Sequence, residues 1–169
     1  MIAIGEVGLP HYLRRKQSNI PLKPYIELLT SFIKRAVLYD KPIILHAVYE
    51  DAPIVCDLLE KYDVKQAHFH WFKGEDATIE RMIERQYVIS ITPDVLYEEK
   101  IQRIVQKYPL ALMLVETDGP WPFEGPFENR MTQPKMIHRS IEKIAHIKEK
   151  PIEEVYETIF QNTIQFYSI

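Results

Sequence analysis

The chain of 169 residues contains 46% hydrophobic and 27% charged residues, a composition typical of one globular domain that excludes disordered and fibrous classes. Its formal net charge of −3 excludes the overall basic field of an avid DNA-binding protein, so nucleic acid would have to be held by a local patch or a metal. The single cysteine, Cys56, excludes an internal disulfide framework and fits a reducing compartment. Neither a secretory signal nor an apolar run of about 18 residues is visible, so we expect a cytoplasmic protein without a membrane partner.

Short apolar runs typical of strands alternate along the chain with segments of helical periodicity. Strands are expected at residues 2–7, 43–47, 66–70, 87–91 and 111–116. Helices are expected at residues 22–39, 51–62, 75–86, 96–107, 133–149 and 152–167. Pro21 precedes the first of these helices and Pro151 the last, as is common where helices begin.

Strict alternation of strands and helices predicts an α/β fold with parallel strands, arranged either as a doubly wound sheet or as a (β/α) barrel. No linker, repeat or low-complexity tract divides the chain, so we expect a single domain over residues 1–169. Both arrangements place their sites at the carboxyl ends of the strands. The long loop at 118–134 is therefore interpreted as an active-site loop.

Residues able to bind a metal stand at or just beyond the ends of four predicted strands, namely Glu6, His46, His70 and Asp118. One such residue alone is more often a hydrogen-bonded core or loop residue. Four at equivalent strand ends favour a divalent-ion site, in which a carboxylate such as Glu6 can bridge two ions.

The strand at 66–70 leaves one ligand ambiguous, because His68 and His70 lie on the same face of it. We favour His70, which is nearer the strand end, and His68 remains an alternative as a ligand or as a hydrogen-bond donor one layer deeper. Glu116 lies two residues deeper than Asp118, where it must be paired or protonated. It is expected to orient a ligand.

Five short segments, in order and at compatible spacing, carry a family resemblance. They are GEVGL at 5–9, PIILHA at 42–47, HWFKG at 70–74, VETDGP at 115–120 and NTIQF at 162–166. These resemble G-E-[IV]-G-L, P-[VI]-x-[IL]-H, H-C-F-[ST]-G, L-E-T-D-[SA]-P and N-x-x-x-F of the TatD-type metal-dependent deoxyribonucleases. The resemblance extends over the whole chain. It implies a parallel (β/α) barrel of the TIM type, incomplete, with about five βα units and C-terminal helices.

The resemblance also implies roles for the four strand-end residues. Glu6 would bridge two ions, His46 and His70 would bind one of them, and Asp118 would bind the other and orient the attacking water. Glu6 and Asp118 are thus the implied catalytic residues, and the reaction is metal-assisted hydrolysis of a phosphodiester in DNA. Mg²⁺ is the ion expected for the family, and the mixed ligands also suit Zn²⁺, Mn²⁺ or Ni²⁺.

The chain departs from the family pattern at three places. The family begins with a strand bearing an H-x-H pair, and nothing before Glu6 supplies it, so we expect a domain truncated at its N-terminus. Pro10 follows the segment GEVGL, where the family usually has Asp. Val48 takes the place of the arginine in the family's frequent H-S-R segment. Because an incomplete barrel exposes sheet edges, we expect the chain to associate with itself.

Three functions remain open at this point. The first is hydrolysis of phosphodiesters, with DNA or a small phosphodiester as the substrate. The second is hydrolysis of small amides, esters or lactones, which Val48 and the acidic net charge favour. The third is an inactive remnant that only binds metal, which the missing H-x-H pair favours.

Overall fold

The computed structural model describes residues 1–169 and contains one sheet of five strands. The strands are β1 (Ile4–Gly8), β2 (Ile43–His46), β3 (Ala67–Phe69), β4 (Val88–Ile91) and β5 (Met113–Val115). All neighbouring strands pair in parallel. Four of the five lie within a strand predicted from the sequence, and β1 overlaps the strand predicted at 2–7 and ends one residue later.

The order of the strands in the sheet, β1-β2-β3-β4-β5, follows their order in the chain. A doubly wound sheet reverses its strand order at a switch point, whereas a (β/α) barrel adds each strand beside the previous one. The observed order is therefore that of the barrel, and the α/β class is confirmed. β1 and β5 each pair with one neighbour only.

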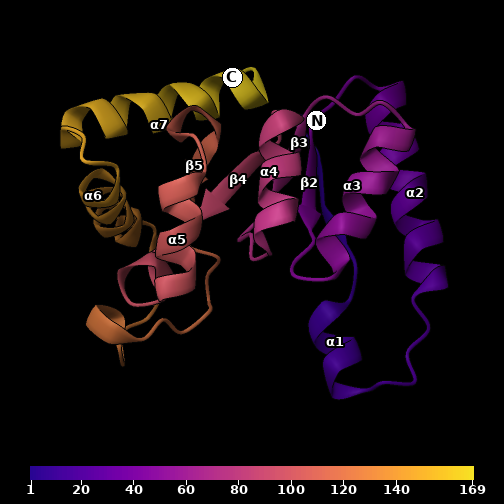
Figure 1. Ribbon diagram of the computed structural model, residues 1–169, viewed down its shortest axis with the longest axis horizontal. Coiled ribbons are helices and arrows are strands. Elements are labelled where there is room, and N and C mark those ends of the chain that lie inside the picture. The colour runs from indigo at the N-terminus through magenta and orange to yellow at the C-terminus, as the bar shows by residue number, and fades with distance from the viewer.

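Seven α-helices connect or follow the strands (Figure 1). They are α1 (His11–Lys16), α2 (Lys23–Leu38), α3 (Asp51–Lys61), α4 (Asp76–Glu84), α5 (Glu99–Lys107), α6 (Ile137–Lys148) and α7 (Ile152–Tyr167). Short 3-10 helices lie at Pro93–Leu96, Leu110–Leu112, Gly125–Phe127 and Pro134–Met136. In Figure 1, α2 and α3 lie on the β1 side of the molecule, and α6 and α7 lie on the β5 side. No helix is both long and apolar enough to cross a membrane.

The core forms where the apolar faces of the helices meet the sheet. In β2, Ile43 and Leu45 are fully buried, and in α2 the buried residues Leu29 and Ile33 lie four residues apart. That spacing places both side chains on one helical face. The apolar spacing of the sequence, which puts Ile26, Leu29, Ile33 and Val37 on one face, predicts the burial of Leu29 and Ile33 but not that of Val37, which is 49% exposed.

The side chain of Asn162 connects the last helix with the start of the last strand. Asn162 Nδ2 of α7 donates hydrogen bonds to the carbonyl oxygens of Leu110 and Met113, both at 2.8 Å. Asn162 is the first residue of the closing NTIQF segment. Its role in that segment is thus to hold α7 against the start of β5.

Candidate metal centre

Glu6, His46 and His70 come together at the carboxyl ends of β1, β2 and β3. Each offers one ligand atom, and the three atoms lie within 4.8 Å of one another. The Glu6 carboxylate lies between the two imidazoles, with Oε1 3.2 Å from His46 Nδ1 and Oε2 3.6 Å from His70 Nε2. Because parallel strands end at one edge of the sheet, side chains distant in the sequence become neighbours here.

Two glycines let β1 approach β2 closely enough for this contact. A Cβ atom at Gly8 would lie 1.9 Å from the carbonyl oxygen of His46, which is its register partner. A Cβ atom at Gly5 would lie 2.6 Å from the carbonyl oxygen of Ile44, and Gly5 has φ of +146°. The two glycines that flank Glu6 therefore have a steric reason for their place in the segment GEVGL.

Asp118 lies beside this cluster but outside it. Its Oδ1 is 4.0 Å from His70 Nε2, and the side chain is 37% exposed. Its backbone is left-handed, with φ of 41°, as are those of Tyr49 and Trp71 in the same pocket, at 51° and 40°. Non-glycine residues in this region carry backbone strain, which concentrates at functional sites.

Glu116 fixes the orientation of the His70 ring. His70 Nδ1 donates to Glu116 Oε2 at 2.8 Å, which leaves Nε2 facing Glu6. Glu116 Oε1 accepts from the Trp71 backbone N–H at 2.9 Å and from the Ser90 hydroxyl. The carboxylate expected to orient a ligand is therefore hydrogen-bonded to His70 and to two further donors.

His68 lies away from the cluster, in a separate hydrogen-bonded chain. It is 5% exposed; its Nε2 lies 2.7 Å from Ser90 Oγ and its Nδ1 2.8 Å from the Tyr167 hydroxyl. Since the Ser90 proton is given to Glu116, His68 Nε2 donates to Ser90 and Tyr167 donates to His68 Nδ1. The chain of bonds runs from the end of α7 to His70, and it leaves His68 no free nitrogen for a metal.

The pKa values of the cluster follow from this geometry. Burial lowers the His70 pKa, but the hydrogen bond to Glu116 and the neighbouring carboxylates outweigh it, so the His70 pKa is raised. The hydrogen bond from His46 lowers the Glu6 pKa. Burial raises the Glu116 pKa, but the bonds from His70 and Ser90 and the His70 charge lower it overall. Both carboxylates are therefore ionised at neutral pH.

The pKa values of Asp118 and His68, near the cluster, are shifted mainly by burial. Burial, with the charges of Glu116 and Glu6, raises the Asp118 pKa. Burial also lowers the pKa of His68 to about 4. His68 is thus neutral at physiological pH, in agreement with its hydrogen bonds, which use one nitrogen as donor and the other as acceptor.

The donor set fits a divalent ion. Ligands about 2.0–2.2 Å from a tetrahedral ion lie about 3.3–3.6 Å apart, close to the 3.2 and 3.6 Å from Glu6 to the two histidines. The hydrogen bond from His70 to Glu116 is the outer contact that metal-bound histidines commonly make. Glu6, His46 and His70 can therefore hold an ion with little rearrangement.

The cluster opens into a pocket of about 750 Å³. Its wall includes Tyr12 and Lys16 of α1, and Tyr49, Trp71, Lys73, Asp94, Tyr97, Glu98, Trp121 and Glu124. Trp71 and Trp121 meet edge to face, with ring centroids 5.3 Å apart. The loop at 118–134 thus contributes to the pocket, as expected from its position after the last strand.

Sequence reasoning missed three residues of the site. Ser90 is a polar residue within the fully buried strand β4, and that is a signal that could have drawn attention to it. Asp94 is 2% exposed and accepts a hydrogen bond from Trp71 Nε1 at 2.7 Å. Tyr167 carries no local signal, because only the fold brings the end of α7 to β3.

Comparison with known proteins identifies the family. The model of the family "TatD related DNase" matches residues 1–168. An uncharacterized metal-dependent hydrolase of Haemophilus influenzae is 41% identical over 167 residues, which cover 99% of this chain and 66% of that protein. The chain belongs to the TatD family of metal-dependent hydrolases.

A further relative and a solved structure extend the comparison to a named deoxyribonuclease and to the fold. The human protein named deoxyribonuclease TATDN3 is 28% identical, over 99% of this chain and 60% of its own length. The crystal structure of the TatD homologue YJJV from Escherichia coli has a TM-score of 0.85 at 24% identity, over 99% of this chain and 64% of that one. The predicted barrel-type fold is confirmed. The chain spans about two thirds of the length of the relatives it matches.

Proposed function

We propose that this chain supplies the metal-binding and catalytic residues for divalent-metal-dependent hydrolysis of phosphodiesters in DNA. The observation that carries the proposal is the Glu6 carboxylate held between the imidazoles of His46 and His70. The family description as a DNase and the printed name of the human relative support DNA as the substrate.

In this proposal each residue has a defined task. Glu6, His46 and His70 hold the ion, and Glu116 keeps His70 Nδ1 protonated so that Nε2 is free to bind. When bound, a divalent ion lowers the pKa of its water and stabilises negative charge on the phosphoryl oxygens. Asp118, whose pKa is raised, orients the attacking water and accepts its proton. No covalent nucleophile is needed.

The identity of the ion is part of the proposal. Mg²⁺ is the ion that the family resemblance implies, but it prefers oxygen ligands and keeps several of its waters. Two imidazoles beside one carboxylate suit Zn²⁺, Mn²⁺ or Ni²⁺ better. We therefore expect tighter binding of Mn²⁺ or Zn²⁺ than of Mg²⁺.

A second candidate is a hydrolase of small amides, esters or lactones, which the charge of the pocket favours. Glu6, Asp94, Glu98, Asp118 and Glu124 line it against two lysines, and the apolar Val48 lies among them. Without a bound ion this excess of carboxylates repels an anionic substrate. Turnover of a neutral ester or lactone, but not of DNA, would favour this candidate over the first.

The proposed function is tested by nucleotide release from a short single-stranded oligodeoxynucleotide in the presence of Mn²⁺ or Mg²⁺. Glu6→Ala and His70→Ala are expected to reduce release at least 100-fold, because each removes a ligand atom. His146→Ala, an exposed histidine of α6, is the matched control and keeps full activity. Bound ion without turnover of any substrate would identify the chain as an inactive metal-binding remnant.

We also propose that the chain associates with itself in a cytoplasmic setting. β1 and β5 each have one paired side, and Met1 and Ile2, which precede β1, are 79% and 56% exposed. An unpaired strand edge beside exposed apolar side chains is a surface that a second copy can cover. A reducing compartment fits the buried, unpaired thiol of Cys56.

A further inference from the structure

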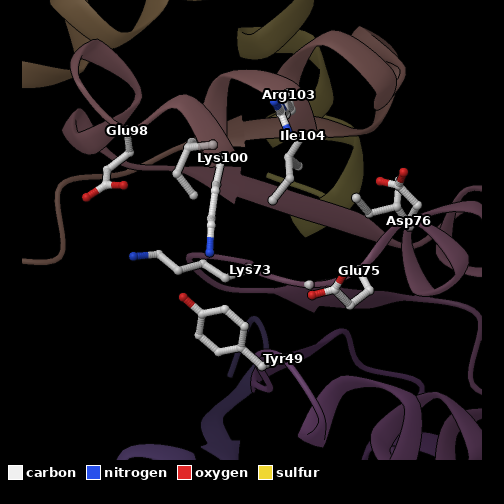
Figure 2. Close-up of a pocket in the computed structure, with 11 residues that line it drawn as sticks. Tyr49, Lys73, Glu75, Asp76, Glu98, Lys100, Arg103 and Ile104 are labelled. Atoms are coloured by element: carbon white, nitrogen blue, oxygen red, sulfur yellow. The ribbon is translucent and has the colours of Figure 1, made fainter.

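A second cavity, of about 330 Å³, lies between the first turns of α4 and α5 and the loop that follows β2 (Figure 2). Small-molecule sites occupy about 300–1,000 Å³, so the cavity can take one compact chemical group. Its lining residues are Tyr49, Lys73, Gly74, Glu75, Asp76, Ile79, Glu98, Lys100, Ile101, Arg103 and Ile104. None of these residues belongs to the metal-binding cluster.

The second cavity adjoins the metal pocket. Tyr49, Lys73 and Glu98 line both. In Figure 2 the Tyr49 hydroxyl points toward Lys73, and the Lys100 side chain reaches down toward Lys73 from α5. A substrate bound at the metal centre can therefore extend past Lys73 into the second cavity.

Lys73 is held in place at this junction. Its Nζ lies 3.4 Å from Asp94 Oδ2 and 4.8 Å from the centre of the Trp71 ring. Its side chain is 22% exposed, and Asp94 is nearly fully buried. An ammonium fixed by a buried carboxylate and an aromatic face is suited to bind a phosphate without first losing much side-chain freedom.

The walls of the second cavity combine apolar and polar surface. Ile79, Ile101 and Ile104 are buried and form an apolar side. The charged residues around this apolar side make no ion pairs; they are Glu75, Glu98, Lys100 and Arg103. This mixture of free donors and acceptors beside an apolar side matches a nucleobase, whose faces are apolar and whose edges are polar, better than it matches a second phosphate.

We propose that the second cavity binds one nucleoside unit of the substrate, next to a phosphodiester held by Lys73. This inference rests on the proposed function, because it takes the substrate to be a chain of nucleotides. It adds a specificity site outside the metal centre. A substrate without a nucleoside would gain nothing from it.

Binding is measured first with added Mn²⁺, using an analogue of the dinucleotide thymidylyl-(3′→5′)-thymidine in which CH₂ groups replace the two bridging oxygens of the phosphodiester, so that the ion is present and turnover does not occur. Arg103→Ala and Ile104→Phe are expected to weaken binding about 10-fold, the first by removing a donor and the second by filling the cavity. Arg35→Ala, an exposed arginine of α2 without an ion pair, is the matched control and should bind like the unchanged protein. Circular dichroism establishes that Ile104→Phe is folded, and Arg103→Ala, at an exposed position, gives an independent test.

Hydrolysis then separates this inference from the proposed function. The two variants should lose about 10-fold in kcat/KM on the dinucleotide and keep their rate on bis(4-nitrophenyl) phosphate, which has no nucleoside. Absence of hydrolysis of both substrates by the unchanged protein would count against the proposed function, while the binding result would still decide the inference. Absence of dinucleotide binding, or equal binding by Arg103→Ala, Ile104→Phe and the unchanged protein, would overturn the inference.

Discussion

The hydrogen bond to Glu116 determines which nitrogen of His70 is available to a metal. Glu116 accepts three hydrogen bonds, from His70, Ser90 and the Trp71 backbone, and all three donors face its two oxygens. A glutamine at this position has one oxygen and an NH₂ group, so at least one donor would face another donor. The arrangement around His70 therefore depends on a carboxylate specifically.

We predict that Glu116→Gln weakens Mn²⁺ binding about 10–100-fold, the range seen when outer partners of metal ligands are removed. Isothermal titration calorimetry measures this. Glu124→Gln is the control, because Glu124 is an exposed carboxylate on the same pocket that makes no bond to a ligand. Equal affinity of both variants would show that Glu116 does not support the ligand.

His68 and His70 are predicted to have different roles, the first in stability and the second in metal binding. His68→Ala should keep metal binding within a few-fold but lower the free energy of unfolding by about 1–3 kcal/mol, because Ser90 and Tyr167 lose a buried partner. His70→Ala should abolish metal binding. Urea denaturation and calorimetry on both variants measure the two effects, and loss of metal binding in folded His68→Ala would reopen the choice of ligand.

Much of the candidate site could be predicted from single positions. The two-residue period of a strand, with polar residues at four strand ends, was enough to select Glu6, His46, His70 and Asp118 as candidate ligands. The same period leaves His68 and His70 on one face, and local pattern cannot rank them. What separates them is Ser90 and Tyr167, and these contacts exist only after β4 and α7 have packed.

At the scale of elements, the contact between β1 and β2 determines the distance between Glu6 and His46. Gly8 allows that contact, since any Cβ there would overlap the His46 carbonyl at 1.9 Å. Such an overlap is with backbone, so a strand must move.

We predict that Gly8→Ala moves the end of β1 away from β2, lowers the free energy of unfolding by about 1–3 kcal/mol, and weakens Mn²⁺ binding at least 10-fold. Gly119→Ala is the control for stability, because its Cβ would meet nothing closer than Thr132 Cγ2 at 3.5 Å. Chemical denaturation and calorimetry provide the two readouts. Unchanged stability and affinity in Gly8→Ala would mean that the strand end tolerates a side chain.

Apolar periodicity predicted the long helices and missed the short one. The segment expected at 22–39 is α2 at Lys23–Leu38, and that expected at 152–167 is α7 at Ile152–Tyr167. α1 spans six residues after Pro10, which is too short for an amphipathic repeat to be visible. The helix expected from residue 96 begins at Glu99, because Pro93–Leu96 forms a separate 3-10 turn.

The outer strands of the sheet, β1 and β5, each have one unpaired side, and the proposed self-association leads to a prediction about the state of this chain in solution. Light scattering at micromolar concentration is expected to give at least twice the mass of 20.0 kDa. Replacing Ile2, which is 56% exposed, with lysine should shift the population toward the single chain. A stable, folded single chain over the same concentrations would contradict self-association.

Local sequence patterns do not predict the order of the strands in the sheet. Alternating strands and helices fit both a doubly wound sheet and a barrel, because the order of strands within a sheet depends on which crossovers pack where. The sequential order observed here distinguishes them. The resemblance to a barrel family favours that order, whereas periodicity does not distinguish the two arrangements.

The hydrogen-bonded chain from Tyr167 through His68, Ser90 and Glu116 to His70 links α7 to the metal centre. Tyr167→Phe would leave every metal ligand intact and still remove the hydroxyl that sets the His68 tautomer. Because metal affinity should stay within a few-fold in this variant, as in His68→Ala, the nitrogen NMR signals of the His68 ring would report the packing of α7 independently of the metal.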